Sequence, residues 1–196
     1  MTISAGFDAL VLAGGAGKRM GSDAAKIDLE VGGITLLERA LAAVDDAGII
    51  VVVGPRRSVG RPVTFTSEDP PGSGPAAAIV HGLQFVAADI VVVLAADAPF
   101  AQPAVPRLLD ALRREPTADC AMLTDDTGRR QPLVAAYRLD ALWRAADGGD
   151  WADQSVRALT ADLDIVDVSA VGSEALDCDT PEQLHAAHDV RAIEPT

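Results

Sequence analysis

Short, uninterrupted apolar runs separated by helical patterns are the feature that most constrains the fold of this chain. The runs lie at residues 9–13, 49–53, 90–95, 121–124, 133–137 and 165–168, with a further short strand at 63–66. Several are continuous rather than alternating, which is typical of strands buried on both faces of a sheet. Strands that alternate with helices predict an α/β fold with a mostly parallel sheet and right-handed crossovers.

Helix-start patterns occur between these runs. Thr35 begins a capping box that opens a helix predicted to end near Gly48, and Thr180 begins a second capping box. Two more helices are predicted over residues 75–87 and 103–114. No internal repeat or linker divides the chain. Its 196 residues therefore predict a single domain over 1–196, ordered over about 7–188.

Composition excludes several functional classes. The formal net charge of −13 argues against nucleic-acid binding, which needs a basic face. No apolar run reaches the roughly 18 residues that span a bilayer, and residues 1–8 lack the pattern of a signal peptide, so we expect a cytoplasmic protein without membrane contact. Cys120 and Cys178 are expected to be buried free thiols rather than a disulfide.

A glycine-rich segment, LAGGAGKRMG, follows the first strand and ends at Gly21. Glycines allow positive φ and a close approach of the backbone to a ligand, and consecutive N–H groups can surround phosphate oxygens. Lys18, Arg19 and Lys26 add a local positive patch to an otherwise acidic chain. The segment therefore favours binding of an anionic small molecule, with an ordinary glycine-containing turn as the alternative.

Two common phosphate-binding motifs do not match this segment. A Walker A loop requires Ser or Thr after the lysine, but Arg19 follows Lys18, and its first glycine would fall on Leu12. A dinucleotide fingerprint requires a tighter glycine spacing than that between Gly15 and Gly21, and an acidic residue after the second strand. Neither an ATPase-type loop nor a dinucleotide site is therefore predicted.

The same segment, with Lys26 shortly after it, resembles the signature of MobA-like nucleotidyltransferases, whose archetype is molybdenum cofactor guanylyltransferase. Residues 67–75, 91–100, 131–138 and 177–184 resemble later segments of this family, in the same order. Two positions depart from the family pattern: Lys26 follows the glycines at a longer spacing, and Gly54 stands where the archetype has an asparagine. Together the matching segments cover most of residues 7–188.

This resemblance implies a three-layer, Rossmann-like nucleotidyltransferase fold that transfers GMP from GTP to molybdopterin, or a nucleotide to another phosphorylated acceptor, and releases pyrophosphate. Arg19 would grip the β- and γ-phosphates, and Lys26 would neutralise charge in the transition state. Asp97 and Asp179 would bind Mg²⁺. The implied nucleotide-binding residues are Leu12, Ala13, Gly14, Gly15, Gly17, Lys26, Asp69 and Gly74.

The position of Asp97 supports a metal role independently. It follows an apolar strand and should lie at a carboxyl end, where open α/β sheets bind ligands. A helix cap or turn is the alternative role for Asp97. Asp179 has a structural alternative of its own, because Asp177 and Asp179 flank Thr180 and would favour the start of a helix.

Other functions remain open. The Leu-Ala-Gly-Gly form, and Gly14 in particular, favours guanylyl over cytidylyl transfer, and sugar- or alditol-phosphate transfer is a related possibility. A non-catalytic nucleotide- or cofactor-binding module is the alternative from another class, with transient contact to molybdoenzymes or cofactor-synthesis proteins. Trp143 and Trp151 are interpreted as core anchors, the alternative being a cover over the acceptor cleft.

Overall fold

The computed structural model describes residues 6–14, 26–178 and 180–193. Within them, the main sheet has the strand order β5-β4-β1-β6-β8-β7-β9. The strands are β1 (Asp8–Leu12), β4 (Ile50–Val53), β5 (Thr64–Thr66), β6 (Ile90–Ala95), β7 (Cys120–Thr124), β8 (Arg130–Arg138) and β9 (Ile165–Ser169). Only β8 runs antiparallel to its neighbours β6 and β7, among the described strands of this sheet. The predicted α/β fold with a mostly parallel sheet is confirmed.

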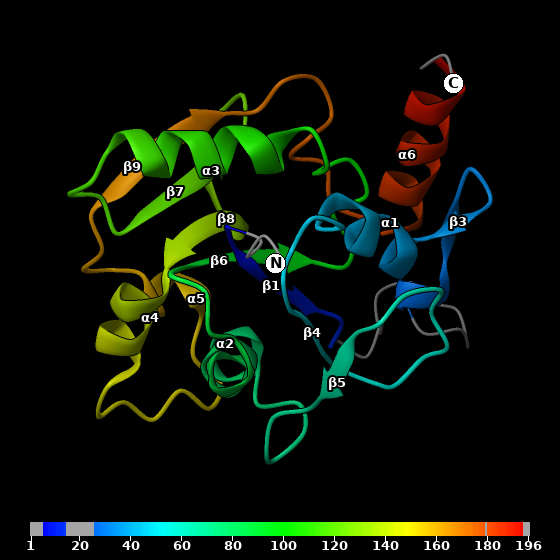
Figure 1. Cartoon of the computed structure of the whole chain (residues 1–196). Helices are drawn as coiled ribbons and strands as arrows, with labels where there is room; N and C mark the ends of the chain where they lie inside the picture. The colour runs from blue at the N-terminus through cyan, green and yellow to red at the C-terminus, as the bar shows by residue number, and fades with distance from the viewer. Residues whose placement is uncertain (1–5, 15–25, 179, 194–196) are drawn as a thin grey trace, which may run out of the picture.

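Helices cover both faces of the sheet and form a three-layer arrangement (Figure 1). One face packs against α1 (Leu36–Ala43) and α3 (Ala104–Arg114). The other packs against α2 (Pro75–Gly82), α4 (Leu139–Ala146) and α5 (Val156–Leu159). Successive side chains of a strand point to opposite faces, so Ala9 and Val11 belong to the first core and Leu10 and Leu12 to the second. Burial on both faces explains why these strands read as continuous apolar runs.

A smaller unit lies beside α1. It consists of the hairpin β2 (Glu30–Val31) and β3 (Ile34–Thr35), the short 3₁₀ helix η1 (Lys26–Asp28) and α6 (Pro181–Ile193). Its own apolar cluster joins Val31 and Leu36 to Phe100 and Cys178. The cluster therefore ties the chain after β6 to the segment that leads into α6.

A buried carboxylate organises the start of the sheet. Asp8 is 3% exposed, and its Oδ1 accepts a hydrogen bond from the Ile49 N–H at 2.9 Å. Its Oδ2 accepts bonds from the N–H groups of Ala87 and Ala88 at 2.7 and 2.8 Å. These bonds fix Ala87 and Ala88 outside the helix, since Val86 before them already has an extended backbone. The predicted continuous helix over 75–87 is wrong: α2 ends at Gly82, and the 3₁₀ helix η2 (Leu83–Phe85) follows.

The helix predicted to reach Gly48 ends at Ala43 instead. Asp45 and Asp46 follow, and acidic side chains are unfavourable near the negative end of a helix dipole. Asp45 forms an ion pair with Arg61. The capping box at Thr35 is present as predicted, with the Glu38 N–H donating to the Thr35 hydroxyl at 3.2 Å.

The hairpin β2–β3 and the helices α4 and α5 were not predicted. Helix α4 begins directly after β8 at Arg138, which supplies no side-chain cap. Trp143 on this helix is 44% exposed, so its interpretation as a core anchor is wrong. Trp151 is half-buried against the second core, and its indole N–H donates to the Ala146 carbonyl at 2.9 Å.

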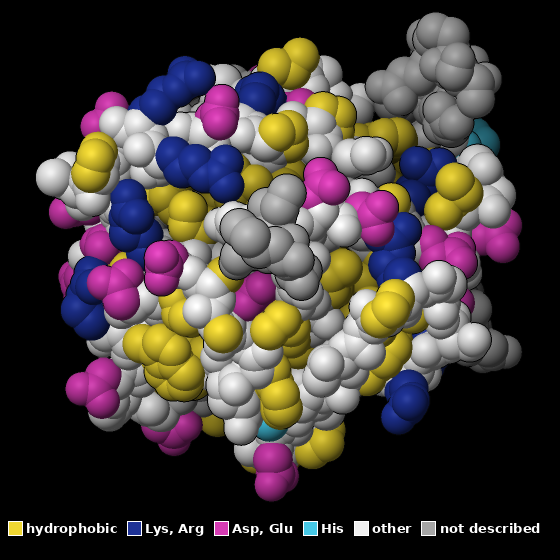
Figure 2. Space-filling view, viewed as in Figure 1, with side chains coloured by type: hydrophobic (Ala, Val, Ile, Leu, Met, Phe, Trp, Pro, Cys, Tyr) yellow, Lys and Arg dark blue, Asp and Glu magenta, His cyan; other side chains and the backbone are white. Residues whose placement is uncertain are grey.

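Charges on the surface are mixed in sign. On the face drawn in Figure 2, acidic and basic side chains are interspersed over α3 and α4. Ion pairs within these helices are Arg114–Asp110 at 3.2 Å and Arg144–Asp140 at 2.8 Å. Both cysteines are buried thiols outside any disulfide, as predicted. Among the described residues, no helix is long and apolar enough to cross a membrane.

Candidate active site

The carboxyl ends of β1, β4 and β6 meet at one edge of the sheet. The Ala13 N–H donates to the Val53 carbonyl at 2.9 Å, and the Ala96 N–H donates to the Leu12 carbonyl at 2.9 Å. The sheet hydrogen bonding therefore continues past the strand ends and brings residues 12–14 close to Asp97. This edge is where open α/β sheets bind ligands.

Gly54 lies directly against the start of the glycine-rich loop. A Cβ atom at this position would come within 2.7 Å of the Ala13 carbonyl carbon and 2.9 Å of the Gly14 nitrogen. Both neighbours are backbone atoms, so no rotamer change relieves the clash. This close approach gives a physical reason for glycine at the position where the archetype of the resembling family has an asparagine.

A cavity of about 460 Å³ opens at this edge. Leu12, Gly14, Gly74 and Asp97, all predicted site residues, line it. Ala13 does not line it and is buried behind the loop. The structure thus gathers residues that are far apart in the sequence around one space.

Glu68, rather than the predicted Asp69, faces this cavity. Asp69 is exposed and does not line it, whereas Glu68 does and is 9% exposed. The Glu68 Oε1 accepts the Gly72 N–H at 2.8 Å, which closes the loop between them. The Asp153 N–H donates to the Ser73 carbonyl at 2.8 Å and anchors the same loop. Glu68 and Asp69 are adjacent in the sequence and have the same acidic chemistry. Only the loop closed by the Gly72 N–H determines which side chain faces the cavity.

Lys26 reaches the site despite its longer spacing from the glycines. Its Nζ donates a hydrogen bond to Asp97 Oδ2 and forms an ion pair with it. The lysine side chain is 13% exposed and the aspartate side chain 24%. The buried Ile27 holds η1 in place, so Lys26 is directed at Asp97 by the fold.

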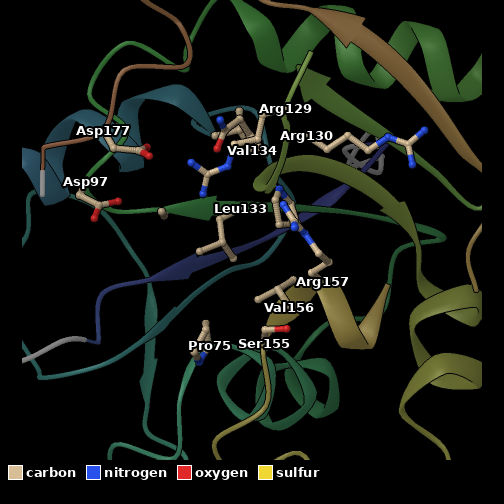
Figure 3. A pocket seen from close by; sticks show the side chains of 13 residues that line it. Pro75, Asp97, Arg129, Arg130, Leu133, Val134, Ser155, Val156, Arg157 and Asp177 are labelled. Carbon is tan, nitrogen blue, oxygen red and sulfur yellow. The ribbon is translucent and has the colours of Figure 1, made fainter. Parts of the chain in front are cut away.

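Asp177 joins this group from the far end of the chain. The Cys178 N–H donates to the Asp97 carbonyl at 3.0 Å, which places the segment before α6 beside the end of β6. Asp177 lines the same cleft as Asp97, and the two side chains lie on the same side of it (Figure 3). The sequence singled out Asp179 as the second carboxylate. Asp179 lies outside the described residues, and Asp177 was missed.

A wider cleft of about 540 Å³ adjoins the first cavity. The two share Pro75, Ala95, Asp97 and Leu133, so Asp97 lies at their junction. Gln131 and Pro132, from the segment predicted to belong to the acceptor half, line this cleft. Arg129, Arg130 and Arg157 also line this cleft (Figure 3), and the sequence offered no motif for them.

Other predicted site residues lie outside the described part of the chain. They are Gly15, Gly17 and Arg19. Their predicted roles in phosphate binding therefore remain predictions.

The residues present suit a divalent cation shared with a substrate. No three His, Cys, Asp or Glu side chains cluster as a complete metal site within residues 6–14, 26–178 and 180–193. Asp97 and Asp177 offer hard carboxylate oxygens at one cleft. Mg²⁺ characteristically takes one or two carboxylates and completes its coordination with water and substrate phosphates.

Solved structures of nucleotidyltransferases share this fold. The chain is similar to molybdopterin-guanine dinucleotide biosynthesis protein A from Archaeoglobus fulgidus, with a TM-score of 0.72 and 23% identity over 95% of this chain and 100% of the other. It is also similar to a nucleotidyl transferase from Methanothermobacter, with a TM-score of 0.75 and 20% identity over 95% of this chain and 98% of that one. At these identities the likeness defines the fold.

The chain belongs to the MobA-like NTP transferase family, whose model matches residues 9–166. It is 33% identical to a probable molybdenum cofactor guanylyltransferase from Chloroflexus aggregans, over 68% of this chain and 66% of that relative. A protein of the same description from Natronomonas pharaonis is 29% identical over 92% of this chain and 96% of the relative. The resemblance first read from the glycine-rich loop is confirmed.

Proposed function

We propose that this protein transfers GMP from GTP to the phosphate of molybdopterin and releases pyrophosphate. The observation that carries the proposal is the meeting of Lys26 and Asp97 at the junction of two cavities. One cavity lies over the loop after β1 and suits the nucleotide, and the other suits the acceptor. A reaction between two bound substrates requires such a junction.

The nucleotide binds in the cavity between residues 12–14 and the loop before α2. Backbone groups of Leu12 and Gly14 face the nucleoside, and the carboxylate of Glu68 accepts hydrogen bonds from its donor groups. A site built on such bonds rejects a base that lacks the matching donors, because its own polar groups would be left unpaired. The matching names of relatives from two organisms favour GTP.

Transfer proceeds by attack of an acceptor phosphate oxygen on the α-phosphorus. The bond to the bridging oxygen of the β-phosphate breaks, and pyrophosphate leaves with that electron pair. Lys26 places its ammonium where this negative charge accumulates, and Asp97 orients it. Bound Mg²⁺, held by Asp97 and Asp177, would supply further charge neutralisation. Arg19 and Asp179 are proposed to assist, the first at the β- and γ-phosphates.

Pyrophosphate release with GTP, CTP, ATP or UTP, Mg²⁺ and molybdopterin tests this proposal. We expect GTP to bind at least ~10-fold more tightly than CTP, about 1.4 kcal/mol, in calorimetric titrations. Chelation of Mg²⁺ should abolish turnover. The Asp97→Asn variant should fold normally and should lower turnover by ~100-fold or more, the usual scale for losing one preorganised electrostatic group.

Each contrary result has a defined meaning. Equal or tighter binding of CTP would assign cytidylyl transfer. Nucleotide binding without pyrophosphate release would indicate a non-catalytic binding module. Release with a sugar or alditol phosphate but not with molybdopterin would reassign the acceptor and leave the nucleotide half of the proposal in place.

A further inference from the structure

Three cavities adjoin one another in series. The nucleotide-side cavity and the acceptor cleft share Asp97. The acceptor cleft in turn shares Arg129, Arg130, Pro132 and Arg157 with a third cavity of about 530 Å³, called here the side pocket. Asp97 does not line the side pocket. Arg129 and Arg157 therefore line both the acceptor cleft and the side pocket, and in Figure 3 the Arg129 side chain lies between Asp177 and Arg157.

These arginines differ in their partners. Arg130 forms a two-pronged ion pair with Asp167, at 2.7 and 3.0 Å, and its side chain extends away from the cleft in Figure 3. Within the described residues, neither Arg129 nor Arg157 forms an ion pair. The chain has 29 acidic and 16 basic residues, yet these two arginines line one cleft without a carboxylate partner among the described residues. The guanidinium groups of Arg129 and Arg157 are therefore available to bind an anion in the cleft.

The backbone under Arg129 is held firmly. Arg129 ends the turn between β7 and β8, and its N–H donates to Asp125 Oδ1 at 2.9 Å. The same oxygen accepts the Thr127 N–H at 3.0 Å, and Gly128 has a φ of +78° that suits glycine in the turn. The turn therefore fixes where Arg129 emerges, while its side chain stays exposed.

Arg157 emerges from an equally defined position. Ser155 caps α5 by accepting the Ala158 N–H at 3.1 Å. Val156 and Leu159 on either side of Arg157 are buried, at 4% and 2% exposure. Anchored backbones with exposed guanidinium groups lower the entropic cost of binding a ligand between them.

We propose that Arg129 and Arg157 bind a second anionic group of the acceptor, separate from the phosphate that attacks the nucleotide. This inference rests on the proposed function. The attacking phosphate must lie next to Lys26 and Asp97, whereas Arg129 and Arg157 also line the side pocket, which Asp97 does not reach. Guanidinium groups bind oxyanions with paired, charge-assisted hydrogen bonds.

The side pocket suits the remainder of such an acceptor. Met122, Pro132, Ala161 and Ile165 supply apolar surface to its lining. Its acidic residue, Asp167, is paired with Arg130. A pocket that combines apolar surface with cationic side chains matches a ligand with an uncharged body and an anionic group. The acceptor class inferred here therefore carries two anionic groups, one reactive and one used for binding.

Steady-state kinetics of Arg129→Gln, Arg157→Gln and the double variant test this inference, with molybdopterin as the acceptor and GTP saturating. Each single variant should raise the acceptor KM by about 10-fold or more, the loss expected for a hydrogen bond between charged groups, and leave kcat within ~3-fold. The dissociation constant of GTP should not change. Arg114→Gln removes the same charge from an exposed site on α3 and serves as the matched control.

Two outcomes would overturn the inference: an unchanged acceptor KM in the double variant, or weaker GTP binding, which would place the arginines at the nucleotide. If the wild-type protein transfers nothing to molybdopterin, the proposed function fails. A measurement that does not depend on turnover then decides whether Arg129 and Arg157 bind an anion. Phenylglyoxal modifies exposed arginines, and inorganic phosphate should protect Arg129 and Arg157 but not Arg114. Equal labelling of all three with and without phosphate would then refute the anion site.

Discussion

Substituting Gly54 should damage both stability and nucleotide binding, although the archetype of the resembling family has an asparagine at that position. A Cβ at Gly54 would lie 2.7 Å from the Ala13 carbonyl carbon and 2.9 Å from the Ala13 oxygen and the Gly14 nitrogen. Real Cβ atoms do not approach backbone this closely, so the start of the glycine-rich loop must move. The φ of +152° at Gly54 adds strain for any residue with a side chain.

The magnitude follows from these two effects. Overpacking against immobile neighbours costs about 1–3 kcal/mol, and a backbone conformation reserved for glycine costs a similar amount. Gly54→Ala and Gly54→Asn should therefore lower the free energy of unfolding by about 2 kcal/mol or more. For a chain of this length that corresponds to a fall in Tm of about 4–8 °C. The displaced loop should also weaken GTP binding by ~10-fold or more.

Gly60→Ala is the matched control, because a Cβ at Gly60 meets nothing within 4 Å. Urea denaturation and calorimetric titration of GTP should be measured on all the variants. If Gly54→Ala unfolds within ~0.5 kcal/mol of Gly60→Ala and binds GTP normally, the close packing of Gly54 on the loop does not constrain the site. A stabilised Gly54→Asn would refute the argument even more directly.

Three further expectations concern charged groups. Lys26→Ala should lower turnover by ~100-fold in a pyrophosphate-release assay. In urea denaturation it should change the free energy of unfolding by less than about 1 kcal/mol, because its partner Asp97 keeps access to water. Asp8→Ala should destabilise the fold by about 3 kcal/mol or more, since it leaves the N–H groups of Ile49, Ala87 and Ala88 without their acceptor, and a normal denaturation midpoint would contradict this. Hydrogen bonds from the Thr127 hydroxyl and the Arg129 N–H lower the pKa of Asp125 from its ordinary value of 3.8. The carboxylate therefore stabilises the turn at higher pH, and this contribution is lost as the pH falls below 3.8. The Tm difference between wild type and Asp125→Ala should shrink over that range, and a constant difference would contradict the assignment.

Much of the fold was predictable because the strands are buried on both faces. Apolar runs of strand length identify such strands directly, and all of the main-sheet strands had been located to within a few residues. The helices were harder to delimit. Asp8 fixes Ala87 and Ala88, where the chain has already left the helix, through bonds that span more than 70 positions, and no local pattern reveals a partner at that separation. Helix α4 lacks a capping side chain, and without one its start carries no local signal.

The site residues also divide into those that the sequence predicts and those that only the fold determines. Lys26 and Asp97 were predicted from a resemblance and from a position after a strand, and both are local features of the sequence. Glu68 and Asp69 are neighbours with the same chemistry, and only the loop closed by Gly72 decides which one faces the cavity. Asp177 reaches the cleft through a single backbone bond between the Cys178 N–H and the Asp97 carbonyl.

The sequence by itself determined the α/β class, the order of the strands along the chain, and the family, because apolar periodicity and the glycine-rich loop are properties of consecutive residues. Tertiary structure alone decided which distant side chains share a cavity. Arg129 in a turn and Arg157 on a short helix are 28 positions apart and belong to no motif, yet they line the same two cavities. Their proximity depends on the antiparallel return of β8 and the packing of α5 against the sheet, which are long-range contacts that the periodicity of neighbouring residues does not encode.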